Sequence, residues 1–234
     1  MKRIMHIFAG LCAALFVVAL LLSVIRGVAL NKEHYMDQYE KNGTAAVIGT
    51  DEAGLSQVTD ELIRYLAAED DVLDVQILIH GKLQPFYNQR EVDHMVDVQN
   101  VMSLAHTVSL VVYGLCAACA IAWAVQRKRL GGFPAKAIPV GFGVGLVALV
   151  AIALYAYLDF SSFWTAFHHV IFTNDLWILN PMTDNLINLV PLPFFFATCM
   201  KIILWWAGLL AVFALGTFAI GHYTKPRANA HKGN

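Results

Sequence analysis

The chain is poor in charge. Only 14% of its 234 residues are charged, whereas 58% are hydrophobic. An average soluble domain has about 25% charged residues, so this composition excludes an ordinary soluble protein. The formal net charge is −1, and without a basic excess there is no reason to expect nucleic-acid binding.

Cysteine is also scarce. The four cysteines, Cys12, Cys116, Cys119 and Cys199, lie within or at the edge of apolar runs, and residues 30–89 contain none. Disulfides therefore do not hold that polar region together. Cys116-x-x-Cys119 has zinc or redox spacing, but no second pair completes a zinc site. We interpret these thiols as small apolar helix residues.

Familiar catalytic motifs are missing as well. The sequence has no G-x-S-x-G elbow and no serine in the context of a nucleophile, which disfavours an acyl-serine enzyme. It also has no H-x-x-x-H or H-E-x-x-H motif, which weakens the case for a metal site. We expect neither a metal nor a diffusible cofactor.

Long apolar runs dominate what is present. A helix that crosses a bilayer needs about 20 mainly apolar residues. Four runs qualify: Ile4–Ile25, Val101–Val125, Ala137–Tyr157 and Ala197–Gly221. The first is longer than the roughly 7–15 residues of a signal-peptide core, and no clear cleavage site follows it, so we interpret it as a retained anchor.

Charge predicts the orientation. In a four-span arrangement every aspartate and glutamate falls on one side. Three basic groups fall on the other: Lys2 and Arg3; Arg127, Lys128, Arg129 and Lys136; and Lys225, Arg227 and Lys232. Short basic loops mark the cytoplasm, so both termini are predicted to be cytoplasmic.

The predicted fold is an all-α, multi-pass membrane protein with a small extracytoplasmic α+β domain between spans 1 and 2. The predicted segments are transmembrane helix 1 (1–29), the extracytoplasmic domain (30–89), an interfacial turn with transmembrane helix 2 (90–126), a cytoplasmic loop (127–136), transmembrane helix 3 (137–158), an extracytoplasmic or interfacial aromatic segment (159–196), transmembrane helix 4 (197–222) and a cytoplasmic tail (223–234).

The polar region after the first span has helical and strand patterns. Apolar residues from Leu55 to Leu66 recur at helical spacing, and Val72–His80 alternates like a strand. Gly81 provides a turn into Leu83–Tyr87, which predicts a short hairpin. A helix and a hairpin are too small for a large core of their own, so we expect them to pack on the ends of the spans.

A first polar stretch lies just before the second span. Asn88 and Glu91 have the spacing of a capping box. A helix that begins there carries Glu91, His94 and Asp97 on one face. The Asp97 carboxylate can then orient the imidazole of His94 as a base. The alternative is a solvated polar turn that caps a membrane helix.

A second polar stretch follows the third span. It contains His168, His169, Asn174, Asp175 and Trp177, and Asp184 follows a turn after it. Imidazole is the side chain best suited to moving protons near neutral pH. The alternatives are a surface histidine pair, or a metal site that uses His94, His168, Asp97 and Asp175 as ligands; we rank the metal site below proton transfer.

The two stretches together resemble the bacterial lipoprotein intramolecular transacylase family, Lit. The resemblance rests on Glu91-x-x-His94-Met95-x-Asp97-Val98, then Phe167-His168-x-x-x-Phe172-x-Asn174-Asp175-x-Trp177, then Pro181-x-x-Asp184-x-Leu186-Ile187 and Pro191-x-x-Phe194-Phe195. The order of these motifs and the four-span layout extend it over nearly the whole chain.

The resemblance implies an acyltransferase that acts on diacylglyceryl-modified bacterial lipoproteins at the membrane lipid surface. The sn-2 acyl chain would move to the α-amino group of the lipoprotein's N-terminal cysteine and give the lyso-form. It further implies two essential histidines on the outer side, His94 and His168. Glu91, Asp97, His169, Asn174, Asp175, Trp177 and Asp184 are expected to support the site or bind substrate.

Two other functions fit the same residues. One is a membrane-embedded, metal-dependent hydrolase built on the same polar cluster. The other is a non-catalytic sensor or accessory protein whose outer domain binds a partner.

Overall fold

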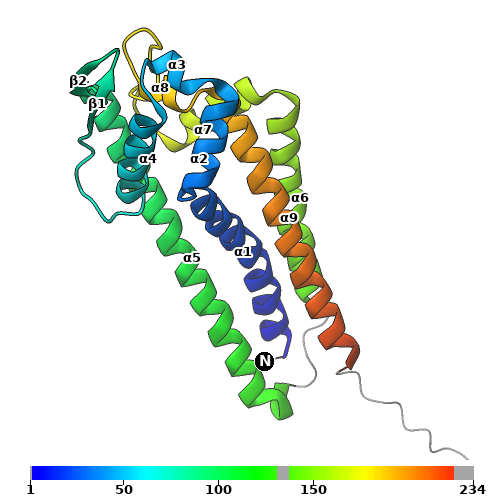
Figure 1. Ribbon diagram of the computed structural model, residues 1–234. Helices are drawn as coiled ribbons and strands as arrows, with labels where there is room; N and C mark the ends of the chain where they lie inside the picture. Colours follow the sequence, from blue (N-terminus) through cyan, green and yellow to red (C-terminus); the bar gives the residue numbers. More distant parts are fainter. Residues whose placement is uncertain (1, 131–136, 224–234) are drawn as a thin grey trace, which may run out of the picture.

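The computed structural model describes residues 2–130 and 137–223, and four long helices dominate it (Figure 1). The elements in chain order are α1 (Lys2–Ala29), α2 (Lys32–Asn42), α3 (Thr44–Ile48), α4 (Glu52–Leu66), β1 (Gln76–Ile79), β2 (Lys82–Pro85), α5 (Gln89–Leu130), α6 (Ala137–Leu158), α7 (Phe160–Ile171), α8 (Leu186–Leu189) and α9 (Leu192–Tyr223).

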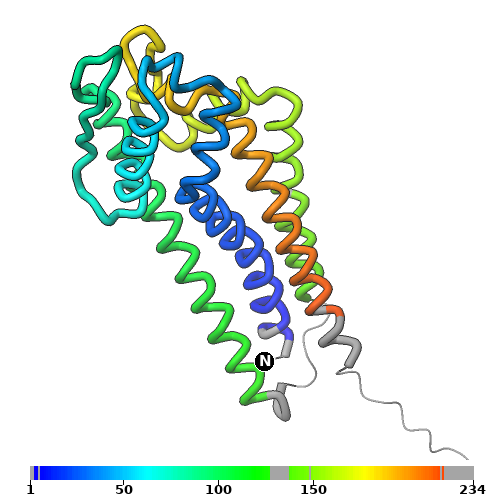
Figure 2. The backbone as a smooth tube through the Cα atoms, viewed as in Figure 1, coloured from blue at the N-terminus to red at the C-terminus, as the bar shows by residue number. Residues whose placement is uncertain are grey.

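All four predicted spans correspond to helices long and apolar enough to cross a membrane. These stretches are His6–Ala29, Gln89–Gln126, Ala137–Leu158 and Leu192–Gly216. The helix α1 contacts each of the other three long helices, and α5 lies on the opposite side of it from α6 and α9 (Figures 1 and 2).

Two boundaries differ from the prediction. No separate turn precedes the second span, because α5 is one continuous helix of 42 residues, about 63 Å long at 1.5 Å per residue. Its first turns therefore extend beyond the roughly 30 Å of a bilayer core. The fourth long helix begins at Leu192 rather than at residue 197. Most of the predicted loop 127–136 and nearly all of the tail 223–234 lie outside the described residues.

Small residues let α1 and α6 approach closely. A Cβ atom on Gly141 would lie 2.0 Å from the carbonyl oxygen of Gly10, so no larger residue fits there. Close backbone approach at small residues is a common way for helices to associate in membranes. Three of the four thiols, Cys12, Cys116 and Cys119, pack between α1 and α5, where Cys12 Sγ lies 3.4 Å from Cys119 Sγ.

The remaining elements gather at the end of the helices opposite the N-terminus (Figures 1 and 2). We call α2, α3, α4, the β1–β2 hairpin, α7, α8 and the segments joining them the cap. As predicted, apolar side chains of α4 face the cap core, and the hairpin pairs β1 with β2 in antiparallel register. The same core includes Met95 of α5 and Phe194 of α9, so the cap packs on the spans, as expected.

The sequence patterns missed α2 and α3. The helix α2 is short and rich in charged residues, so it has no long apolar stripe to reveal it. The aromatic segment 159–196 is mixed: it contains α7, an irregular stretch over 172–185, α8 and the start of α9.

Candidate active site

A capping box begins α5, as the spacing predicted. Asn88 Oδ1 accepts a hydrogen bond from the backbone N–H of Glu91 at 3.1 Å, and Glu91 Oε2 accepts one from the backbone N–H of Asn88 at 2.8 Å. The two residues satisfy backbone donors reciprocally at a helix start. This fixes the rotation of the first turns of α5, and with it the direction of His94.

The same residues tie α5 to the segment before α8. The second oxygen of Glu91 accepts from the backbone N–H of Leu186, and Asn88 Nδ2 donates to Asp184 Oδ1 at 2.8 Å. We call Asn88, Glu91, Asp184 and Leu186 the clamp. Partial burial opposes ionisation of Asp184, but hydrogen bonds from Asn180, Thr183 and Asn88 outweigh it and lower its pKa. Asp184 is therefore a charged acceptor near neutral pH.

We expect Glu91→Ala to destabilise the protein. Glu91 is fully buried, and the truncation leaves two backbone N–H groups without their acceptor, at a cost of about 1–3 kcal/mol each. The midpoint of thermal unfolding in detergent should fall by several degrees. Glu91→Gln, which keeps one oxygen acceptor, should lose less, and Asp93→Ala, at an exposed position of the same helix, should be neutral. An unchanged midpoint for Glu91→Ala would show that the clamp contributes nothing.

Two histidines from different helices meet in the cap. The ring centroids of His94, on α5, and His168, on α7, are 6.3 Å apart, with the planes inclined at 31°. Their exposed fractions are 7% and 6%. The structure therefore brings together the two residues that the sequence places 74 positions apart.

His168 has a defined tautomer. Its Nδ1 lies 2.7 Å from the carbonyl oxygen of Trp164. A carbonyl can only accept, so Nδ1 carries the proton and Nε2 of the neutral ring keeps a free lone pair. Burial lowers the pKa of His168, with the neighbouring His169 adding to the effect and the Trp164 carbonyl opposing it. His168 is therefore a neutral base at pH 7, oriented by a backbone carbonyl.

Aromatic rings enclose the histidine pair. Phe172 places its ring 5.2 Å from that of His94 and 5.6 Å from that of His168. Trp164 and Trp177 each lie 4.7 Å from His168, measured between centroids. These rings exclude water, which strengthens electrostatic interactions inside the site.

Two buried polar atoms at the site have no partner. They are Nδ1 of His94 and Nε1 of Trp177. Buried polar groups are nearly always hydrogen-bonded, and exceptions call for an explanation such as a catalytic role. Both atoms belong to rings that lie beside His168: the His94 ring is 6.3 Å from it, and the Trp177 ring is 4.7 Å from it and tilted by 32°.

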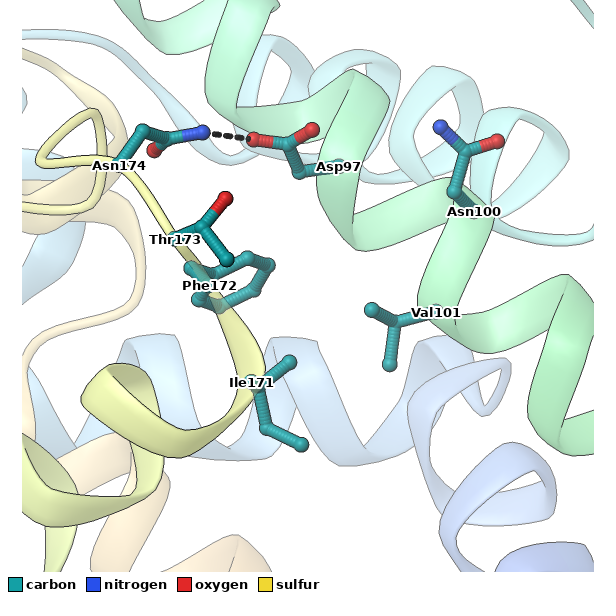
Figure 3. A pocket seen from close by; sticks show the side chains of 7 residues that line it. All are labelled: Asp97, Asn100, Val101, Ile171, Phe172, Thr173 and Asn174. Atoms are coloured by element: carbon teal, nitrogen blue, oxygen red, sulfur yellow. Dashed lines mark hydrogen bonds between the residues drawn. The ribbon is translucent and has the colours of Figure 1, made fainter.

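The other predicted site residues have different surroundings. Asp97 Oδ2 accepts a hydrogen bond from Asn174 Nδ2 at 2.8 Å (Figure 3), and no hydrogen bond joins Asp97 to His94 in the described part of the chain. The expectation that Asp97 orients His94 is therefore not met by direct contact. Asp175 is exposed, and its carbonyl accepts from Arg90. His169 is exposed and packs edge-on against Trp177.

A cavity of about 170 Å³ lies between α5 and the chain at the end of α7 (Figure 3). Phe172 belongs both to its wall and to the rings around His94 and His168. The wall is polar at Asp97 and Asn174 and apolar at Val101 and Ile171. The complete lining is Asp97, Asn100, Val101, Ile171, Phe172, Thr173 and Asn174.

The geometry favours proton transfer over metal binding. Among residues 2–130 and 137–223, no three histidine, cysteine or acidic side chains are placed to hold a metal ion. Of the four ligands in the metal hypothesis, Asp97 bonds to Asn174, whereas His94 and His168 face each other among aromatic rings. This arrangement can move a proton at one atom and deliver one at another.

The chain resembles known proteins over most of its length. The model of the family described as lipoprotein intramolecular transacylase Lit matches residues 10–195. No curated protein sequence matches the chain.

Solved structures of the Bacillus cereus lipoprotein intramolecular transacylase Lit, an integral membrane protein, share the fold. One has a TM-score of 0.74 and 18% identity and covers 95% of each chain. A second, in which one histidine is replaced by arginine, has a TM-score of 0.71 and 19% identity and covers 96% of this chain and 95% of that one. A third, with a histidine replaced by alanine, has a TM-score of 0.70, 19% identity and coverage of 95% and 93%.

Proposed function

The chain belongs to the lipoprotein intramolecular transacylase family Lit, and from this premise we propose that it moves the sn-2 acyl chain of a diacylglyceryl-cysteine to the α-amino group of the same cysteine. The substrates are diacylglyceryl-modified bacterial lipoproteins in the membrane, and the product is the lyso-form. The observation that carries the proposal is the buried pair of histidines, 6.3 Å apart, one with a free Nε2 lone pair.

The reaction balances without a cofactor. A bond forms between the cysteine nitrogen and the acyl carbonyl carbon, the ester bond to the sn-2 oxygen breaks, and one proton passes from nitrogen to oxygen. Nucleophile and ester belong to one molecule, so holding them in the right geometry supplies much of the rate.

The two histidines take complementary roles. His168, whose Nε2 is the acceptor of its fixed tautomer, removes the proton from the attacking nitrogen. His168 passes this proton to the neighbouring His94, whose Nδ1 has no protein partner. His94 then delivers it to the leaving sn-2 oxygen, so both rings begin and end the cycle neutral.

Trp177 is a better oxyanion donor than Asn174. Asn174 is one of the residues expected to support the site, but its Nδ2 donates to Asp97. The indole N–H of Trp177 is buried, has no partner and belongs to a ring that packs at a tilt against His168. A hydrogen-bond donor that is already in position and unpaired can stabilise the negative charge that develops on the oxygen of the tetrahedral intermediate.

The cavity beside Phe172 suits the lipid part of the substrate. Val101 and Ile171 form its apolar part, and Val101 begins the long apolar run of α5. Asp97 and Asn174 form its polar part. Acyl chains can enter from the bilayer side while the glycerol and ammonium groups face the polar part.

The reaction is tested with purified protein and a synthetic lipopeptide that carries an isotope-labelled sn-2 chain. The label should appear on the cysteine nitrogen, and a chelator should not slow its transfer. Release of the label as free fatty acid, with inhibition by the chelator, would instead establish the metal-dependent hydrolase. No change in the lipopeptide would favour the non-catalytic sensor.

We further propose that the cap faces the cell exterior and that both termini are cytoplasmic, because acidic residues concentrate in the cap and basic ones flank the opposite ends. In a background without native cysteines, a membrane-impermeant thiol reagent should label Gln57→Cys in intact cells and Lys128→Cys only after lysis. Labelling of both in intact cells would overturn this orientation.

A further inference from the structure

The cap contains a second cavity, of about 240 Å³, that shares no wall residue with the first. It forms where the junction of α2 and α3 meets α8 and the start of α9. Figure 1 shows α3 and α8 side by side in the cap. Its lining residues are Asn42, Thr44, Val47, Asn188, Pro191 and Pro193.

Two polar atoms of its wall residues lack partners. Thr44 is 1% exposed, and its hydroxyl oxygen makes no hydrogen bond. The side-chain nitrogen of Asn42 is likewise buried and unpaired. An unmade hydrogen bond at a buried group is destabilising, and neither group contributes to the clamp or to the histidine pair.

The chemistry of the wall identifies the kind of ligand. Three wall residues carry neutral hydrogen-bonding groups, and Val47, Pro191 and Pro193 are apolar. No charged side chain belongs to the wall, so neither a phosphate headgroup nor an ammonium group finds a counter-charge. Amides and hydroxyls are complementary to the N–H and C=O groups of a polypeptide.

Residues of the cavity wall follow closely after a residue that is hydrogen-bonded to the helix of His94, and the cavity is open to solvent. The N–H of Leu186 bonds to Glu91, one turn before His94, and Asn188 reaches the cavity two residues later. At the cavity edge, Val47 is 59% exposed and Pro193 is exposed. In the proposed orientation, the polypeptide of a lipoprotein whose acyl chains lie in the membrane leaves the bilayer on the side of the cap.

We propose that this second cavity binds the uncharged, extended polypeptide segment that follows the lipidated cysteine. The inference rests on the proposed function. An extended chain covers about 3.3 Å per residue, so a segment of about ten residues has a reach of about 33 Å from a cysteine held at His94 and His168. The cavity then contributes to the choice among lipoproteins.

The test compares two diacylglyceryl substrates, one with a dipeptide and one with a peptide of about ten residues. The wild-type protein should show a lower KM for the longer substrate. Thr44→Val removes the hydroxyl, and Val47→Trp fills the cavity. Each should raise the KM for the longer substrate about fivefold to tenfold and leave kcat unchanged. For Thr44→Val this rise corresponds to the loss of about one hydrogen bond. Thr107→Val, the same substitution at an exposed position of α5, should alter neither substrate.

The outcomes distinguish the proposed function from the role of the second cavity. If the wild-type protein converts neither substrate, the proposed transacylase function is wrong. If it converts both with the same KM, the cavity holds only water and the peptide proposal is overturned. A rise in KM that is equal for both substrates in the Thr44→Val protein would contradict it too. Since the Thr44 hydroxyl has no protein partner, the unfolding midpoint of this variant should not fall, which separates lost binding from lost folding.

Discussion

Replacing His94 or His168 by glutamine should abolish formation of the lyso-form, while the protein should still insert and fold. Glutamine keeps hydrogen-bonding capacity but cannot shuttle protons near neutral pH. Loss of a general acid or base reduces rates by about 100- to 10,000-fold. The label-transfer assay measures this loss, and an unchanged unfolding midpoint shows that the fold is retained.

His169→Gln is the matched control at the neighbouring position. His169 is exposed and contacts Trp177 edge-on, whereas His168 is buried and bonded to the Trp164 carbonyl. His169→Gln should therefore lose far less activity than His168→Gln. The opposite order of activities would assign the role of base to His169 instead of His168. Full activity in all three variants would contradict the proton-transfer mechanism.

Trp177→Phe should lower kcat by about 100-fold, the typical effect of removing one oxyanion donor. Phenylalanine retains much of the ring packing on His168, so KM and the unfolding midpoint should change little. The comparison is Trp205→Phe, at a tryptophan of α9 that is 60% exposed and should be neutral. A KM that rises as much as kcat falls would assign Trp177 to substrate binding instead.

The sequence predicts those features that depend on local spacing. Apolar runs long enough for a bilayer predicted all four spans, and the Asn88–Glu91 spacing predicted the capping box that the structure contains. The apolar stripe of α4 predicted the side that packs on the cap core. In each case the period of one helix determines the result, so distant residues are not needed.

Features that depend on tertiary contacts were not predictable in this way. The spacing places Asp97 on the same helix face as His94. In the structure, however, the Asp97 carboxylate accepts a hydrogen bond from Asn174, which lies in a segment far along the chain. The carbonyl of Trp164 orients His168, and no side-chain pattern reveals a backbone acceptor. Phe172 belongs to the motif on which the resemblance rests. Its contacts with both the cavity and the histidines can be seen only in the folded structure. The unpaired Trp177 nitrogen likewise becomes visible only when all its neighbours are in place.

The most direct measurement is mass spectrometry of lipoprotein N-termini from a bacterial host that lacks N-acylation. Expression of this protein should convert diacylglyceryl N-termini into an isomer of equal mass with one chain on glycerol and one on the cysteine nitrogen, distinguished by fragmentation. Expression of the His168→Gln protein at the same level should leave the N-termini unconverted. N-termini that stay diacylglyceryl with the wild-type protein, or that lose an acyl chain altogether, would contradict the intramolecular transfer proposed here.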